Sequence, residues 1–79
     1  MNSQQSRAAR ALLKWSQTQL ADASGVGLST VAEFENDKRE PWLGNLAAMR
    51  LALEDAGVEF IPAKSGNGVG VRLREDQEQ

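Results

Sequence analysis

The side chains available for chemistry in this chain of 79 residues are carboxylates, hydroxyls, carboxamides and basic groups, because it contains neither cysteine nor histidine. Their absence removes disulfides, thiolate nucleophiles, imidazole bases and the commonest zinc ligands. The carboxylates are scattered along the chain and form no recognisable catalytic geometry with a nucleophile. We therefore expect neither an enzyme nor a bound cofactor or metal.

Charge is unevenly distributed along the chain. The net charge of −2 argues at first against a nucleic-acid partner, since Lys and Arg normally supply much of the affinity for phosphate. Residues 1–50, however, hold six basic and five acidic groups, whereas residues 51–79 hold three basic and six acidic ones. The first part is thus near neutral, and the acidic excess lies towards the end.

The length is that of one small domain, and such a domain buries only about 60% of the surface that its unfolded chain exposes. It leaves little room for a separate ligand pocket, so we expect regulation through dimerisation or a partner protein. No start typical of a signal peptide is present, and apolar runs are far shorter than a membrane span requires. We expect a soluble cytoplasmic protein that does not enter membranes.

An amphipathic helix is predicted at the start of the chain, capped by Asn2 or Ser3 and ending near Lys14. Residues three or four positions apart predict its apolar face: Ala8, Ala11, Leu12 and Trp15. We assign Trp15 to the core rather than to base stacking, because a tryptophan that ends such a helix is usually structural.

Two short helices joined by a glycine turn are predicted next. Ser16 and Gln19 form a capping box, which starts a helix at Gln17, and Gly25 can adopt the positive φ that ends this helix after Ser24. A third helix is predicted from Leu28 to about Asn36, before a polar loop that ends at Pro41. Four apolar residues form the wedge between the two helices: Leu20, Val26, Val31 and Phe34. Ala21 must be small because the third helix crosses over it.

The rest of the chain predicts one helix and one hairpin. Asn45 can cap a fourth helix, 46–56, which Gly57 ends. Beyond Gly57, apolar residues alternate with other residues with a period of two, which predicts strands over 58–61 and 69–73 with a glycine-rich turn between them. The hairpin either packs on the helices or pairs with the hairpin of a second subunit. We thus expect a mainly α fold, with a helix-turn-helix domain over 1–57, a hairpin and possible dimerisation element over 58–73, and a disordered tail over 74–79.

The residues from Gln17 onward resemble one family in particular. Three motifs carry the resemblance: Gln17-x-x-Leu-Ala-x-x-x-Gly-Val, Thr30-Val-x-x-Phe-Glu-Asn, and Lys38-Arg39 before a proline. Together they resemble the Cro and phage-repressor helix-turn-helix family, also called the xenobiotic-response-element type, over residues 7–57. The resemblance implies a small bundle of four helices like that of lambda repressor. It also implies binding to double-stranded DNA as a homodimer, with the third helix in the major groove.

The resemblance also places roles on single residues. The base-reading positions correspond to Leu28, Ser29, Thr30 and Glu33, and the phosphate-binding positions to Gln17, Asn36, Lys38 and Arg39. Arg10 and Glu35 match a pair that bridges the first and third helices. No arginine or glutamine stands among the base-reading positions, and phosphates repel the Glu33 carboxylate, so we expect binding that is weak or selective against non-specific DNA.

Three functions are compatible with this sequence. The first is a transcriptional regulator, a repressor or autoregulator, that occupies a palindromic operator as a homodimer and is nucleoid-associated when bound. The second is the DNA-binding antitoxin of a toxin–antitoxin module, whose acidic tail or hairpin binds the toxin. The third is a protein-interaction module, such as an anti-activator, that reuses the helix-turn-helix frame. The position of Trp42 stays open between packing on the fourth helix and exposure at a dimer contact.

Overall fold

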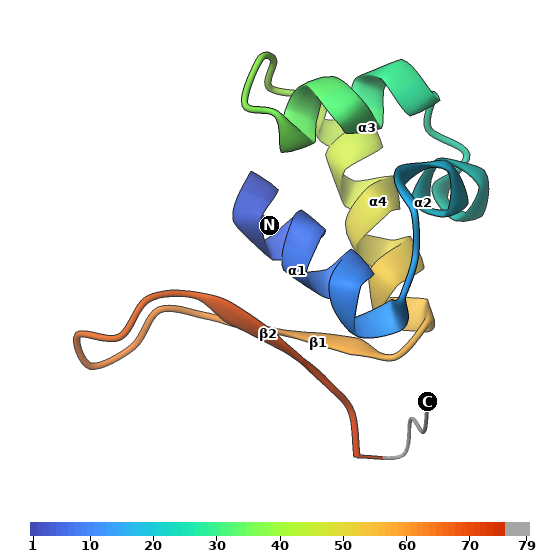
Figure 1. The fold of residues 1–79 in the computed structure, drawn as a ribbon. Helices are drawn as coiled ribbons and strands as arrows, with labels where there is room; N and C mark the ends of the chain where they lie inside the picture. Colours follow the sequence, from blue (N-terminus) through green and yellow to red (C-terminus); the bar gives the residue numbers. More distant parts are fainter. Residues whose placement is uncertain (76–79) are drawn as a thin grey trace.

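The computed structural model describes residues 1–75. Four helices and two strands follow one another: α1 (Ser3–Leu13), α2 (Gln17–Ser24), α3 (Leu28–Glu35), α4 (Leu43–Asp55), β1 (Val58–Ile61) and β2 (Gly70–Leu73). The helices gather into a bundle, and the hairpin of β1 and β2 crosses one side of it and extends beyond it (Figure 1). The predicted mainly α fold with a C-terminal hairpin is confirmed.

The core is formed where the helices meet. The predicted wedge residues Leu20, Val26, Val31 and Phe34 are all buried, and so is Ala21. Met49 and Leu53 of α4 and Val58 of β1 complete the same cluster, and Trp15 is half-buried against it. Within residues 1–75, no helix is long and apolar enough to cross a membrane.

The predicted buried face of α1 is wrong. Ala8 and Ala11 are exposed, whereas the buried residues are Ser3, Gln5, Ser6, Ala9 and Leu13. The buried stripe carries polar side chains whose hydrogen bonds are made inside the protein, so an apolar pattern does not reveal it. Asn2 is the N-cap, and Gln5 completes a capping box with it.

The predicted start of α4 is also wrong. The helix begins at Leu43 rather than Leu46, with Trp42 as an N-cap that supplies no side-chain hydrogen bond. Its first backbone bond runs from the Leu46 amide to the Trp42 carbonyl at 3.0 Å. The Trp42 ring lies beside Gly44, 3.4 Å from where a β-carbon of residue 44 would stand. The predicted cap residue, Asn45, therefore lies inside the first turn.

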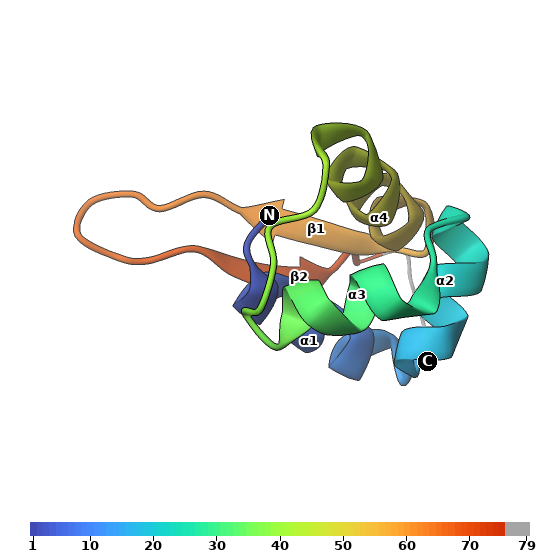
Figure 2. The same ribbon diagram turned by 90° about the horizontal axis from the view of Figure 1, so that it is seen from above.

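The hairpin is antiparallel, with Val58 opposite Leu73 and Ile61 opposite Gly70. Its inner face packs on the helical core at the base of the hairpin, whereas residues 62–69 at its far end are all exposed. Gln5 of α1 donates to the Gly70 carbonyl at 3.1 Å. Seen from above, the far end of the hairpin projects away from the helices (Figure 2).

The expected disordered tail begins within the described range. Arg74 is joined to the helical part by two bonds of 2.8 Å, from its backbone amide to the Gly57 carbonyl and from its guanidinium to the Glu54 carbonyl. The end of that expected tail, residues 76–79, lies outside the described residues.

Candidate nucleic-acid interface

The turn between α2 and α3 is built from local hydrogen bonds. Ser16 accepts from the Gln19 amide at 3.1 Å and the Gln19 side chain accepts from the Ser16 amide at 2.7 Å, which confirms the predicted capping box. Gly25 has φ of 73° and donates to the Ala21 carbonyl at 2.9 Å. This left-handed residue turns the chain so that α3 can begin at Leu28, after Gly27.

A buried carboxylate joins the first three helices. Glu35 at the end of α3 is only 1% exposed. Arg10 of α1 donates to it from Nε at 3.0 Å to each oxygen and from Nη2 at 2.6 Å to Oε1. Ser6 donates to Oε2, and Gln17 at the start of α2 donates to Oε1 at 3.1 Å. Each of the three helices thus contributes a side chain to one centre, which we call the Glu35 network.

The backbone around Glu35 is tied into the same centre. Arg7 donates to the Glu35 carbonyl, and Arg10 donates to the Trp15 carbonyl at 3.0 Å. Among the described residues, no buried side-chain nitrogen or oxygen lacks a hydrogen-bond partner. The relative orientation of α1, α2 and α3 is therefore set by directed bonds as well as by packing.

Two opposing effects act on the Glu35 carboxyl. Burial raises its pKa, because a charge is less stable away from water. Hydrogen bonds from Arg10, Ser6 and Gln17, together with the positive charge of Arg10, outweigh burial and leave the pKa below the ordinary value of 4.5. Glu35 is therefore ionised at neutral pH and forms a true ion pair with Arg10.

The loop after α3 is closed by backbone bonds. Asp37 has φ of 60°, and the amides of Asp37 and Lys38 donate to the carbonyls of Phe34 at 3.0 Å and Glu33 at 2.8 Å. This is a Schellman motif with aspartate where glycine is usual. The Asp37 carboxylate also accepts a hydrogen bond from Ser3 of α1. Two anchors thus fix the direction in which the chain enters Lys38 and Arg39.

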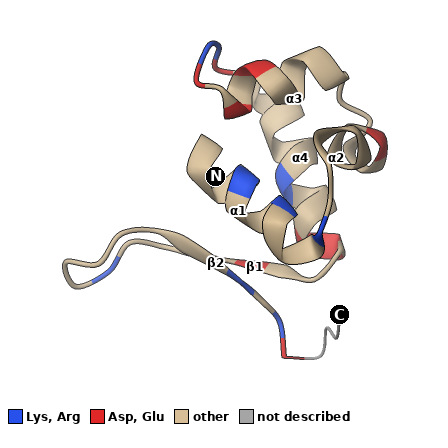
Figure 3. Ribbon diagram, viewed as in Figure 1, with Lys and Arg blue, Asp and Glu red and all other residues tan. Residues whose placement is uncertain are grey.

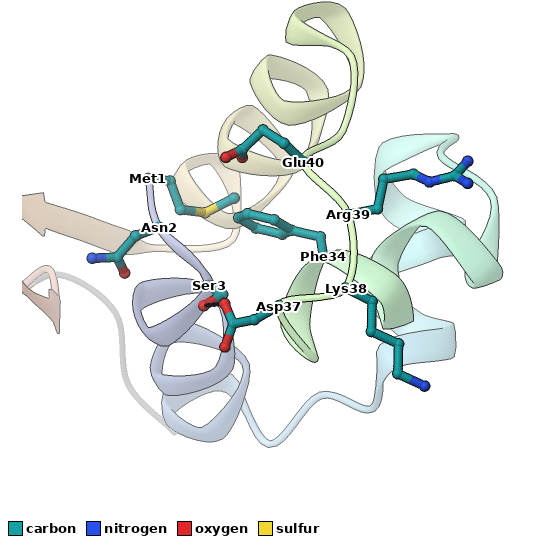
Figure 4. A pocket seen from close by; sticks show the side chains of 8 residues that line it. All are labelled: Met1, Asn2, Ser3, Phe34, Asp37, Lys38, Arg39 and Glu40. Carbon is teal, nitrogen blue, oxygen red and sulfur yellow. Dashed lines mark hydrogen bonds between the residues drawn. The ribbon is translucent and has the colours of Figure 1, made fainter.

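A cleft of about 350 Å³ lies beside this loop. It is lined by Met1, Asn2, Ser3, Phe34, Asp37, Lys38, Arg39 and Glu40. Figure 4 shows Asp37 directed towards Ser3, whereas the Lys38 and Arg39 side chains extend away from the cleft. The two basic side chains are exposed and are free to meet an external ligand.

The base-reading candidates all lie on α3, but their exposure differs. Leu28 is 47% exposed and Ser29 is exposed, whereas Thr30 and Glu33 are half-buried. Gly27 before them is the N-cap and provides no side-chain bond, so no cap side chain covers the first turn of α3. Leu28 and Ser29 are therefore the most accessible of the four.

The phosphate-binding candidates gather at the other end of α3. Asn36, Lys38 and Arg39 follow the helix directly and are exposed. Gln17 comes from α2, but its bond to Glu35 places it at the same end, and it is half-buried there. The Gln17 amide is thus partly engaged inside the protein.

Basic residues do not gather on α3 itself, which contains no lysine or arginine. They lie on α1, on α4, in the loop after α3 and on the hairpin (Figure 3). Arg7 and Arg10 are engaged with Glu35, so Lys38 and Arg39 are the basic pair nearest to α3 whose side chains extend outward. In the loop after α3, this basic pair stands between the exposed acidic residues Asp37 and Glu40.

Sequence reasoning missed four residues of this site: Ser3, Ser6, Arg7 and Asp37. Ser6 lies four positions before Arg10, and this spacing puts both on one face of α1, so the pattern held a signal for it. The contact of Asp37 with Ser3 spans 34 residues, and no local pattern could reveal it.

Comparison with known proteins adds two findings. The family model described as helix-turn-helix matches residues 7–54, which include all of α2 and α3 and most of α1 and α4. Among curated proteins, no sequence matches the chain. Because the matched segment covers more than half of the chain and contains the turn described above, the protein belongs to the helix-turn-helix family of DNA-binding domains of the Cro and phage-repressor, or xenobiotic-response-element, type.

Proposed function

We propose that this protein is a transcriptional regulator that binds a specific double-stranded DNA sequence as a homodimer and represses by occupying a promoter. Membership of a DNA-binding helix-turn-helix family implies a DNA partner, and proteins of this family are typically not enzymes. The observation that carries the proposal is the presentation of α3, whose first residues are exposed while its last residue is fixed in the Glu35 network.

Sequence readout is assigned to the start of α3. Ser29 can donate to or accept from several bases, and the Leu28 side chain can pack on a thymine methyl group. Thr30 and Glu33 lie deeper, and Glu33 can accept from the amino group of a cytosine. With no bidentate arginine or glutamine on α3, each base contact contributes less discrimination than in stronger readers.

Backbone contacts are assigned to the other end of the helix. Lys38 and Arg39 are exposed beyond α3 and carry the positive charge that a phosphate requires. Gln17 and Asn36 can each add one hydrogen bond to phosphate oxygens. Such contacts position α3 in the groove without specifying sequence, and two copies would occupy half-sites about 34 Å apart.

The test is selection of preferred sites from random duplex DNA, followed by binding measurements at several salt concentrations. Ser29→Ala should change the preferred site, because it removes a base contact. Arg39→Ala should weaken binding to every sequence and reduce the salt slope by about one. Lys64→Ala is the matched control: it removes one positive charge from the exposed far end of the hairpin and should leave the slope unchanged.

A protein-interaction module remains the second candidate, favoured by the lack of basic residues on α3 and by the exposure of Leu28. The same selection separates the two candidates. A folded chain that enriches no duplex at low salt contradicts DNA readout and favours a protein ligand for α3.

A further inference from the structure

We propose that the outer face of α4 is the surface through which two copies of this chain associate, antiparallel and about a two-fold axis at Ala47. This surface is the subunit contact of the homodimer in the proposed function. The inference rests on the proposed function only in what the dimer does, which is to bind DNA.

The outer face of α4 carries a row of exposed apolar side chains beside one solvent-accessible ion pair, Arg50–Glu54. Leu43 is 79% exposed, Leu51 is 56% exposed and Ala47 between them is exposed. Their spacing of four residues places them on one face, and Trp42, 78% exposed, stands at its start. The opposite face holds the core residues Met49 and Leu53. Helices that are apolar on both sides are normally buried on both sides, so this face lacks its partner in a single copy.

The arrangement of large and small residues matches a second copy of itself. Ala47 lies midway between the two leucines. When two α4 helices run antiparallel with their Ala47 residues opposed, Leu43 of each copy meets Leu51 of the other, so the Leu43–Leu51 contact forms twice. The small side chain at the crossing allows the helices to approach closely. Such a surface is self-complementary, as a two-fold contact requires.

The charges at the two ends of α4 suit an antiparallel copy. The last turn of α4 contains Glu54 and Asp55 and no basic residue, and its first turn contains no acidic residue and has no side-chain cap. This is the reverse of what the helix dipole favours. Arg50 offsets Glu54 at 3.2 Å, but Asp55 is exposed. In the antiparallel pair, the acidic end of each helix lies towards the positive end of the other, which offsets both unfavourable ends.

The hairpin is the competing contact surface, and it supplies a matched control. Its inner face is already covered at the base by the helical core, and Val69, 46% exposed, is a large apolar residue on its surface. Leu51→Arg and Val69→Arg both place one positive charge on an exposed apolar position, so neither is expected to disturb the fold. They differ only in the surface that they charge.

The first test is sedimentation equilibrium of the purified full chain over a concentration series. The unchanged protein and the Val69→Arg variant should form dimers. Leu51→Arg should weaken the dimer by about a hundredfold or more, because each copy loses a buried leucine contact and gains a charge in its place. A chain that stays monomeric at every concentration, alone and on duplex DNA, overturns the proposal. So does a dimer that Val69→Arg disrupts and Leu51→Arg leaves intact.

The second test uses the absence of native cysteine. Under mild oxidation, Ala47→Cys should form a covalent dimer readily, because the two residues meet at the axis within disulfide distance. Val69→Cys should not. Rapid cross-linking at Val69 but not at Ala47 overturns the proposal.

Failure of the proposed function and failure of the α4 contact give different results. A dimer that is cross-linked through Ala47 yet ignores every duplex supports the α4 contact and contradicts DNA readout. A chain that reads duplex DNA as a monomer contradicts the α4 contact and leaves DNA readout standing.

Discussion

The Glu35 network and the C-terminal hairpin each contain an arginine–glutamate pair, yet the two pairs lie in opposite surroundings. Arg10 and Glu35 meet at 2.6 Å with side chains 17% and 0% exposed, whereas Arg72 and Glu59 meet at 3.0 Å with side chains 63% and 46% exposed. The first pair joins α1 to α3, with Gln17 of α2 bonded to the same carboxylate, and the second joins two neighbouring strands. The same chemistry is therefore used once to orient distant elements and once on a solvated surface.

The difference in burial between the two pairs shows where this fold requires a fixed geometry. A buried ion pair gains little net stability over an apolar pair, because removing two charges from water costs about as much as their attraction returns. Its directed bonds do, however, select one arrangement of the helices. We infer that the network serves to hold α3 at one angle to α1 and α2, a requirement that the far end of the hairpin does not share. The variants below test that contrast, beginning with the largest expected effect.

Arg10→Met should produce the largest loss of stability. It leaves the Glu35 carboxylate buried without its strongest partner, which costs about 3–5 kcal/mol in the free energy of unfolding. Urea denaturation followed by tryptophan fluorescence measures this loss. The control is Arg10→Met combined with Glu35→Leu, which removes both charges and should recover much of the loss. If the double variant is as unstable as the single one, an uncompensated charge is not the cause.

The Glu35 network should also make stability depend on pH. Because the pKa of Glu35 is lowered in the folded protein, its contribution is fully present above about pH 4.5 and is lost as the pH falls through the folded pKa. The urea midpoint should therefore fall in acid, and part of that fall should disappear in Glu35→Gln. If the urea midpoints of the unchanged protein and of Glu35→Gln depend on pH in the same way, protonation of Glu35 does not contribute to the pH dependence of stability.

Two glycines extend the comparison to the backbone. Gly25 and Gly66 have φ of 73° and 83°, and a β-carbon at either would meet nothing within 4 Å. Alanine therefore introduces backbone strain of about 1–2 kcal/mol at both positions. Gly25→Ala should lower the free energy of unfolding by that amount, because the turn fixes α3 against the core. Gly66→Ala should lower it much less, because the exposed turn can open locally. Equal losses in thermal unfolding would contradict this difference in rigidity.

Local rules predicted the helix-turn-helix itself well. The Ser16 capping box and the left-handed Gly25 are set by residues within four positions of one another, and both are found as predicted. The wedge of Leu20, Val26, Val31 and Phe34 follows from apolar spacing, and all four are buried. Short-range hydrogen bonds and hydrophobic burial decide these features, and both are visible in the sequence.

Features that depend on distant partners were not predicted. Gln5 and Ser6 are buried in α1 because they bond to Gly70 and Glu35, so the buried face of the helix cannot be read from apolar residues alone. The helix α4 starts at Leu43 without a side-chain cap, whereas the sequence offered Asn45 as the better cap. In the candidate site, the positions on α3 follow from the family motif, but the Ser3–Asp37 contact that anchors Lys38 and Arg39 does not.

The smallest effect is expected at the hairpin pair. The Arg72 guanidinium holds the pKa of Glu59 below its usual range by hydrogen bonding and by charge, but both side chains remain largely in water. Solvent screening therefore removes most of the benefit of the pair. Glu59→Gln should leave the urea midpoint unchanged at moderate salt, and amide exchange in β1 should rise only slightly. If Glu59→Gln instead destabilised the protein as strongly as Arg10→Met, the hairpin would have to be an integral part of the cooperative core, and the contrast between the two regions would fail.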